Sequence, residues 1–380
     1  MLMAIFILKL IFIGATIVNI CYWLILFSKF VYFREQKRSE SEGDSGSKIY
    51  PQPLVSIIIC AKNEAENLRK FLPRILSQTY RSIELVLVED GSTDNTLEIM
   101  QEFQKRNSTL RIIIISNTKK LYIGKKEALL KGVNAASGDL ILLTDADCEP
   151  IGDQWAATMS NLIQKPYELG LGYSPYRKYP GLLNRLIRLE TIYTAIQYFS
   201  FAVAGMPYMG VGRNLIYKKE LIERVNGFHE HIHLASGDDD LFVNAVATSS
   251  NTAIQLSPES FMISEPARTW KAYYRQKSRH LTTGQMYKKK HQLLLGALAM
   301  SHLLHYMGGF VLVYIKVSTI FVFLLYVMRM LVVMYLYNRI LRKLRDPSLL
   351  PWVPIFDFAF VLYYCILSPS LLKRKTQQWK

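Results

Sequence analysis

Cysteine is scarce in this sequence, and acidic residues are missing from a long part of it. The 380 residues include only 4 cysteines, none in a C-x-x-C pair, so neither a zinc site nor a disulfide framework is indicated. Residues 266–345 contain 14 Lys and Arg but no Asp or Glu. Half of all residues are hydrophobic, which excludes a disordered chain.

The formal net charge of +16 is compatible with nucleic-acid binding, but the positions of the charges favour a membrane. Many basic residues flank long apolar runs, and anionic lipid headgroups attract basic residues in that position. The sequence therefore predicts a lipid bilayer, and not nucleic acid, as the partner of the positive charge.

The N-terminal apolar run predicts a membrane anchor over residues 11–33, long enough to span a bilayer. It lacks the short apolar core and small-residue cleavage site of a signal peptide. Lys29 and Arg34 lie at its C-terminal end, whereas only Lys9 precedes it. The positive-inside rule then predicts that the following domain is cytoplasmic, at the inner face of the plasma membrane.

The C-terminal third predicts two more membrane spans, over residues 293–315 and 317–337. A third apolar segment, residues 349–367, is interrupted by Pro351, Pro354 and Asp357. It can either cross the membrane or lie in its interface, so the number of crossings stays open.

The middle of the chain predicts an α/β domain. Apolar, β-branched runs predict strands over 54–60, 83–88, 111–115 and 139–144, and helical spacing predicts helices over 63–76, 96–105 and 125–136. Such alternation is typical of a parallel sheet with helices on both faces. Ligands bind at the carboxyl ends of such strands, where the polar loops 61–64, 89–94 and 145–149 fall.

The acidic pair Asp145-Ala146-Asp147 follows the last of these strands. Hard cations such as Mg²⁺ and Mn²⁺ take carboxylate ligands together with substrate phosphates. A D-x-D pair alone also fits a solvated acidic loop, but its place at the end of the fourth strand favours a metal site.

A second acidic cluster, Gly237-Asp238-Asp239-Asp240, precedes an apolar segment. A carboxylate that faces an acceptor hydroxyl can act as a general base. The same cluster fits a helix N-terminus, which favours negative charge, and the two interpretations are compatible. Likewise Asp90 fits either a nucleotide contact or an Asp-Gly turn, and Arg279 fits either phosphate binding or an interfacial helix.

The order of these motifs resembles the family 2 glycosyltransferases, which are inverting, membrane-attached enzymes with a GT-A fold. The resemblance covers roughly residues 53–284. The matching segments are 55–64, Val88-Glu89-Asp90-Gly91-Ser92-Thr93-Asp94, Gly124-Lys125, Asp145-Ala146-Asp147, Gly237-Asp238-Asp239 and Gln276-x-x-Arg279.

The resemblance implies a role for each matching residue. Residues that bind the nucleotide-sugar are implied at Ala61, Asn63, Glu64, Asp90, Lys125, Asp145, Gln276 and Arg279. Asp147 is implied to hold Mg²⁺ or Mn²⁺ with Asp145 assisting, and Asp239 to be the catalytic base beside Asp238. Arg213 and Asn214 resemble a segment on the acceptor side.

Two positions depart from the family pattern. Glu89 stands where the family usually has Asp, and His280 stands where it has a Trp that packs near the acceptor in processive polymerases. The second departure argues against long-chain polymerisation more than against sugar transfer.

The predicted organisation is an anchor (1–33), a linker (34–53), a GT-A domain (54–290) with a nucleotide-sugar half (54–150) and an acceptor half (151–290), and a C-terminal membrane region (291–380). The predicted reaction moves a sugar from a nucleotide-sugar, expected to be a UDP-sugar, to a lipid-linked or cell-envelope glycan. A processive polysaccharide synthase, a nucleotidyltransferase and a non-catalytic scaffold are the alternatives.

Overall fold

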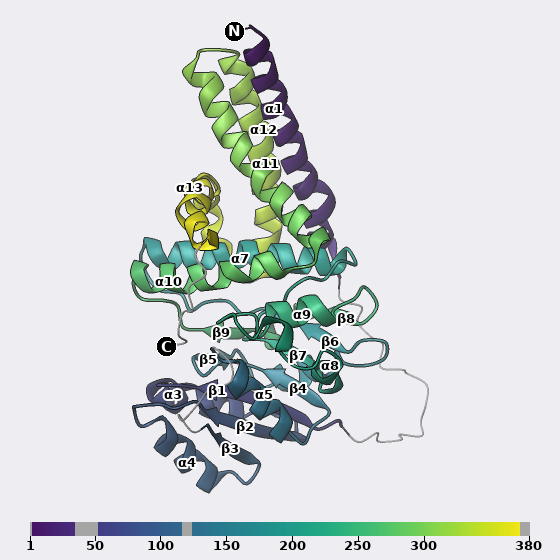
Figure 1. The fold of residues 1–380 in the computed structure, drawn as a ribbon, viewed down its shortest axis with the longest axis vertical. Helices are drawn as coiled ribbons and strands as arrows, with labels where there is room; N and C mark the ends of the chain where they lie inside the picture. The colour runs from purple at the N-terminus through teal and green to yellow at the C-terminus, as the bar shows by residue number, and fades with distance from the viewer. Residues whose placement is uncertain (1, 35–51, 116–123, 373–380) are drawn as a thin grey trace. The chain divides into compact units, whose positions relative to one another are not determined.

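The computed structural model describes residues 2–34, 52–115 and 124–372, so nearly all of the predicted linker lies outside the described residues. The described chain forms two compact units. The sheet unit comes from Phe33–Lys178 and Gly205–Pro266, and the helical unit comes from Met1–Tyr32, Tyr179–Ala204 and Ala267–Arg374. Figure 1 labels most of their helices and strands.

The sheet unit contains a seven-stranded sheet in the order β3-β2-β1-β4-β7-β6-β8. Its strands are β1 (Val55–Ala61), β2 (Ile83–Glu89), β3 (Leu110–Ile114), β4 (Leu140–Leu143), β6 (Leu169–Leu171), β7 (Leu215–Lys218) and β8 (Thr252–Ile254). The first four are parallel, which confirms the predicted half of the sheet. β7 runs antiparallel to β4 and β6, so the complete sheet is mixed.

Helices cover both faces of this sheet, as the alternation predicts. Ile57 and Ile59 of β1 share one core with Leu68, on the face covered by α3, α4 and α6. Ile58 points the other way, where Gly132 of α5 packs so closely that a Cβ would lie 2.8 Å from it. The bounds are α3 (Ala65–Leu76), α4 (Thr96–Arg106), α5 (Lys126–Ala135), α6 (Trp155–Ser160), α8 (Glu220–Arg224), η2 (His229–His231), α9 (Asp240–Val246) and η3 (Pro258–Ser260).

A two-stranded sheet completes this unit. β5 (Cys148–Pro150) pairs antiparallel with β9 (Met262–Ser264). Because β5 begins directly after the D-x-D pair, its pairing with β9 holds the loop that follows the carboxyl end of β4 and contains the two carboxylates.

The helical unit is built from long apolar helices. Its elements are α1 (Leu2–Cys21), η1 (Tyr22–Phe27), α2 (Ser28–Tyr32), α7 (Leu182–Val203), α10 (Trp270–Leu281), η4 (Thr282–Met286), α11 (Lys289–Tyr314), α12 (Thr319–Lys343), η5 (Pro347–Trp352) and α13 (Val353–Leu372). Four stretches are long and apolar enough to cross a membrane: Leu2–Tyr32, Lys289–Tyr314, Thr319–Lys343 and Pro347–Leu367.

The N-terminal helix is longer than the sequence predicts. It begins at Leu2 rather than at residue 11, and Lys9 lies half-buried within it. The residues before Lys9 are all apolar, and the aliphatic stem of one lysine packs along a helix without ending it.

The last apolar segment contains the predicted interruptions at places where a helix tolerates them. Pro351 lies in η5 and Pro354 in the first turn of α13, where no hydrogen bond to a preceding turn is lost. Asp357 is buried and paired with Arg329 of α12. The segment therefore remains a candidate span.

Candidate active site

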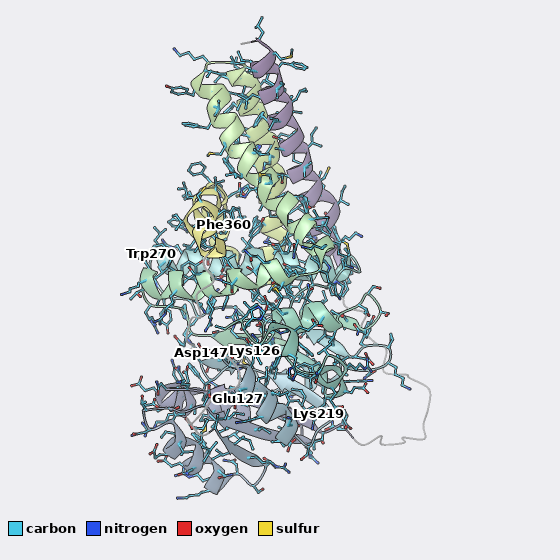
Figure 2. The ribbon with its side chains drawn as sticks, in the orientation of Figure 1. Lys126, Glu127, Asp147, Lys219, Trp270 and Phe360 are labelled. Atoms are coloured by element: carbon cyan, nitrogen blue, oxygen red, sulfur yellow. The ribbon has the colours of Figure 1, made fainter. Side chains whose placement is uncertain are left out.

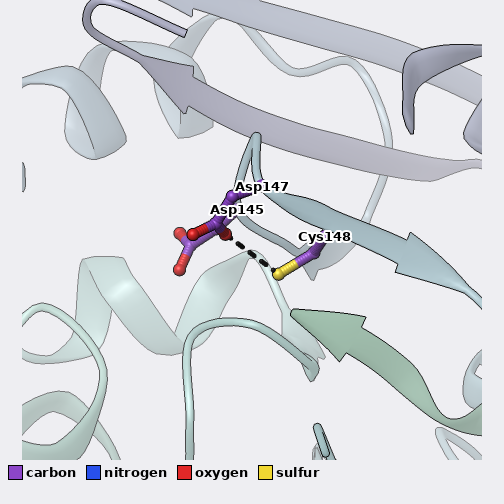
Figure 3. Close-up of side chains that lie close together, drawn as sticks. All are labelled: Asp145, Asp147 and Cys148. Atoms are coloured by element: carbon purple, nitrogen blue, oxygen red, sulfur yellow. Dashed lines mark hydrogen bonds between the residues drawn. The ribbon is translucent and has the colours of Figure 1, made fainter. Parts of the chain in front are cut away.

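The D-x-D pair lies in the loop between β4 and β5 of the sheet unit. Cys148, the first residue of β5, donates its thiol to Asp147 Oδ1 at 3.3 Å. Ligand atoms of Asp145, Asp147 and Cys148 all lie within 4.8 Å of one another (Figure 3). Two carboxylates at this spacing fit a divalent cation that also binds substrate phosphate.

Lys125, just before α5, forms an ion pair with Asp145. Its side chain is only 14% exposed. Burial acts to lower the pKa of Lys125, but the charge of Asp145 outweighs it, so the pKa is raised above the usual value. The ammonium therefore stays charged beside the D-x-D pair.

Arg213 supplies a second positive charge. Its guanidinium carbon lies 4.4 Å from the centroid of the Tyr176 ring, and Nη1 is buried with no hydrogen-bond partner among the described residues. Burial acts against the charge, but Tyr176, Cys148, Asp145 and Asp147 together raise the pKa of Arg213. An arginine held this way can form further hydrogen bonds with an anion.

Asp239 lies at the N-terminus of α9 and is held by two backbone amides. Its Oδ1 accepts from the N–H of Asp240 at 2.7 Å, and its Oδ2 accepts from the N–H of Gly212 at 2.7 Å. Burial, together with the charges of Asp238 and Asp240, raises the pKa of Asp239 to about 7. The carboxylate is thus both a helix cap and a group that titrates near neutral pH.

The two acidic motifs meet through the segment that contains Gly212 and Arg213. Gly212 donates to Asp239, and the adjacent Arg213 interacts electrostatically with Asp145 and Asp147. Lys125 interacts with both Asp145 and Asp238. Within the sheet unit, residues far apart in the sequence therefore share one region of charge at the carboxyl edge of the sheet.

The residues predicted to bind the nucleotide lie at the ends of β1 and β2. Asp90 is fully buried, and its N–H donates to Ala61 O at 2.9 Å. Asn63 has a positive φ of 56° and accepts from the N–H of Thr93 at 2.7 Å. Glu89, the departure from the family pattern, accepts from the N–H of Ser92 at 2.5 Å, so its longer side chain braces this turn.

Glu64 and Asn214 are held inside the sheet unit. Glu64 is buried and accepts from Asn67 Nδ2 at 2.5 Å. The Asn214 amide donates to Tyr173 O at 2.9 Å and accepts from Trp155 Nε1 at 2.9 Å. Asn214 therefore joins loops in the core, while Arg213 beside it interacts electrostatically with the acidic pair.

Gln276 and Arg279 lie on α10 of the helical unit, and both are half-buried. Thr269 caps this helix by accepting from the N–H of Ala272 at 3.2 Å. Their predicted contact with a diphosphate stays a prediction.

Sequence reasoning missed Gly212, Cys148 and Lys126 as parts of this region. Gly212 acts through its backbone N–H, and a pattern of side chains in the sequence cannot indicate such a contact. Lys126 has a signal, because it directly follows a predicted site lysine.

Residues 56–224 match the family model described as Glycosyl transferase family 2. Residues 165–365, more than half of the chain, match Glycosyl transferase family group 2. The chain belongs to the family 2 glycosyltransferases. It is therefore a member of a family of enzymes, as the motifs predict.

Relatives and a solved structure agree with this assignment. The chain is 26% identical over 242 residues to a probable glycosyltransferase, YdaM, of Bacillus subtilis, covering 60% of this chain and 54% of that protein. It is 34% identical over 105 residues to an undecaprenyl-phosphate 4-deoxy-4-formamido-L-arabinose transferase of Pseudomonas aeruginosa, covering 27% of this chain and 30% of that protein. The chain thus spans about half or less of these relatives.

The solved structure of a mannosyltransferase from Pyrobaculum calidifontis, in complex with GDP-Man and Mn²⁺, has the same fold. The TM-score is 0.59 at 18% identity, covering 92% of this chain and 99% of that one. This likeness confirms the predicted GT-A fold.

Proposed function

We propose that the protein transfers a sugar from a nucleotide-sugar to an acceptor hydroxyl, with inversion at the anomeric carbon. The observation that carries this proposal is the meeting of Asp145 and Asp147 with Asp239 through Gly212 and Arg213. A direct displacement needs a site for the leaving diphosphate and a base for the acceptor in one place.

On the donor side, Asp147 with Asp145 would hold Mg²⁺ or Mn²⁺. Such a cation supplies charge neutralisation for the departing diphosphate. Lys125 and Arg213 bring two fixed positive charges to the same place. The ends of β1 and β2 would hold the base and ribose through Ala61, Asn63, Glu64 and Asp90, and Gln276 with Arg279 would close over the diphosphate.

On the acceptor side, Asp239 would accept the proton of the attacking hydroxyl. Its pKa of about 7 suits a base that works near neutral pH. Its two backbone hydrogen bonds fix the orientation of the carboxylate. Asp238 would act as its charged neighbour.

The acceptor is proposed to be lipid-linked or part of a cell-envelope glycan, with the donor a UDP-sugar used at the cytoplasmic face of the membrane. The four candidate spans and the undecaprenyl-phosphate transferase among the relatives support this. The predicted boundaries at residues 33, 53, 150 and 290 belong to the same proposal.

A donor screen on the full chain in nanodiscs tests the proposal. Nucleotide-sugars are offered with Mn²⁺ and a polyprenyl-linked sugar or an oligosaccharide, and released nucleoside diphosphate is measured. Asp147→Asn should abolish turnover and weaken donor binding, whereas the exposed Asp153→Asn should match the wild type. Full activity of Asp147→Asn, or release of pyrophosphate as in a nucleotidyltransferase, would contradict the proposal.

A processive polysaccharide synthase is the second candidate. The chain is 30% identical over 138 residues to a poly-beta-1,6-N-acetyl-D-glucosamine synthase of Staphylococcus epidermidis, covering 36% of this chain and 32% of that protein. Sizing the product by mass spectrometry separates the two, because single transfer gives one added sugar and a synthase gives a ladder.

A further inference from the structure

Lys126, labelled in Figure 2, is a fully buried charge at the start of α5. Its Nζ donates to three backbone carbonyls: His231 at 2.9 Å, Leu234 at 2.5 Å and Ser236 at 2.6 Å. A lysine ammonium has three N–H donors, so these three acceptors use all of them. Hydrogen bonds from a charged donor are stronger than neutral ones.

The three carbonyls belong to one short loop that leads directly into the acidic cluster. Gly237, with a φ of +101°, follows the loop and precedes Asp238 and Asp239. Gly124 packs on the same loop so tightly that a Cβ there would lie 2.4 Å from Ala235 O. The turn before α5 and the loop before α9 are thus fitted to each other.

The charges around this ammonium keep it protonated. Burial lowers the pKa of Lys126 to about 8, and the carboxylates of Asp238, Asp239 and Asp240 oppose that shift. Burial, followed by the charge of Lys126, lowers the pKa of His231 to about 4, so His231 is neutral at neutral pH. Lys126 is therefore a cation that interacts with all three carboxylates of the acidic cluster, whereas Lys125 interacts with Asp238 alone among them.

Burying an ammonium costs several kcal/mol unless hydrogen bonds and opposite charges repay it. A methionine of similar length would fill the same space without that cost. Here the three hydrogen bonds join the N-terminal end of α5 to the loop of residues 231–236. The buried charge therefore serves to hold this loop in one position.

We propose that Lys126 is a positioning residue for Asp239: it holds the loop of residues 231–236 so that the Asp239 carboxylate is fixed for proton transfer. This inference rests on the proposed function, in which Asp239 is the base. The neighbouring Lys125 pairs with Asp145 instead, so consecutive lysines hold the two sides of one site.

Hydrogen exchange on the full chain tests, without any substrate, whether Lys126 holds the loop of residues 231–236. In Lys126→Met, backbone amides of residues 231–241 should exchange at least ten-fold faster, while amides of β1 keep the wild-type rate. Lys105→Met, which changes an exposed lysine of α4, is the control and should change neither. Unchanged exchange in Lys126→Met would overturn the proposal.

Kinetics then separate a positioning role from a purely structural one. With the donor identified by the screen, Lys126→Met should lower kcat about 10- to 100-fold and leave the donor KM within two-fold. Loss of the cation should also raise the pKa of Asp239, so the acidic limb of the pH–rate profile should move to higher pH. The proposal would be overturned if Lys126→Met lowered the melting temperature but kept the wild-type kcat per folded molecule and the wild-type position of the acidic limb.

Lys126→Gln, which keeps two N–H donors without the charge, carries the same tests if the methionine variant does not fold. It should show an intermediate increase in exchange and the same direction of pH shift, and wild-type values in both would refute the inference. A wild-type protein with no turnover on any donor would instead refute the proposed function, while the exchange rates would still show whether Lys126 holds the loop.

Discussion

Buried charges occur in both units, but their partners differ. In the helical unit, Arg329 donates to Asn19 Oδ1 at 2.8 Å and forms two hydrogen bonds with Asp357, which also accepts from Tyr306 at 2.5 Å. In the sheet unit, Arg213 keeps a buried nitrogen without a hydrogen-bond partner among the described residues, and Asp239 lies between two like charges.

This difference separates two uses of a buried charge. The Arg329–Asp357 pair joins α12 to α13, and Asn19 and Tyr306 extend the connection to α1 and α11. Its groups are satisfied by one another, which suits the holding together of helices. Arg213 and Asp239 of the sheet unit instead retain capacity for an outside ligand or a proton, which suits binding and proton transfer.

Removing the base should produce the largest effect. Asp239→Asn keeps the shape of the side chain but cannot accept the proton, so kcat should fall by about 10²- to 10⁴-fold. Donor affinity, measured by calorimetry with Mn²⁺, should stay near the wild-type value, because Asp239 is assigned to the acceptor. Turnover within two-fold of the wild type would remove Asp239 from the mechanism.

Breaking the pair in the helical unit should affect stability and leave the chemistry alone. Arg329→Met leaves Asp357 buried without its cation, at a cost of about 3 kcal/mol, which thermal unfolding in detergent would report as a lower melting temperature. The double variant Arg329→Met/Asp357→Asn should recover part of that loss. If Arg329→Met kept the wild-type melting temperature but lost kcat, the buried pair of the helical unit would serve the reaction and not stability, which contradicts the comparison.

The pH–rate profile should follow Asp239. Since the base must be deprotonated, kcat/KM should rise with pH through about 7 and then level off. Asp238→Asn removes a like charge, which lowers the pKa of Asp239 and moves this limb to lower pH. A profile that falls with pH over this range, or a limb that Asp238→Asn moves upward, would argue against the assignment.

The smallest effect is on stability. Because the pKa of Asp239 is raised in the folded protein, its contribution to stability is present at low pH and is lost as pH rises through about 7. Above that pH the ionised Asp239 carboxylate destabilises the folded protein, because it is buried beside two like charges. Asp239→Asn removes this destabilisation, so its melting temperature should exceed that of the wild type by a few degrees at pH 8 and by less at pH 5. Equal differences at both pH values would contradict the raised pKa.

The sequence predicts the parallel half of the sheet well, because each of its strands is a short buried run bounded by a polar loop. β1, β2, β3 and β4 all begin and end within one or two residues of the predicted bounds. The other half of the sheet, formed by β7, β6 and β8, was not predicted. β6 and β8 have three residues each, too few for an alternating pattern to be recognised.

The candidate site was predictable to the extent that it consists of carboxylates and lysines at strand ends. What the sequence could not give are contacts made by the backbone, such as the Gly212 N–H on Asp239 and the three carbonyls that receive Lys126. Any residue type can supply such groups, so no motif reports them.

Iron-directed cleavage tests the central claim most directly, because Fe²⁺ bound in place of Mg²⁺ or Mn²⁺ generates radicals that cut only nearby backbone. With ascorbate and oxygen, mass spectrometry of the full chain should find cuts near Asp147, near Gly212 and at residues 237–240, and Asp147→Asn should lose all three. Cuts near Asp147 alone would show that the two acidic motifs do not share one site.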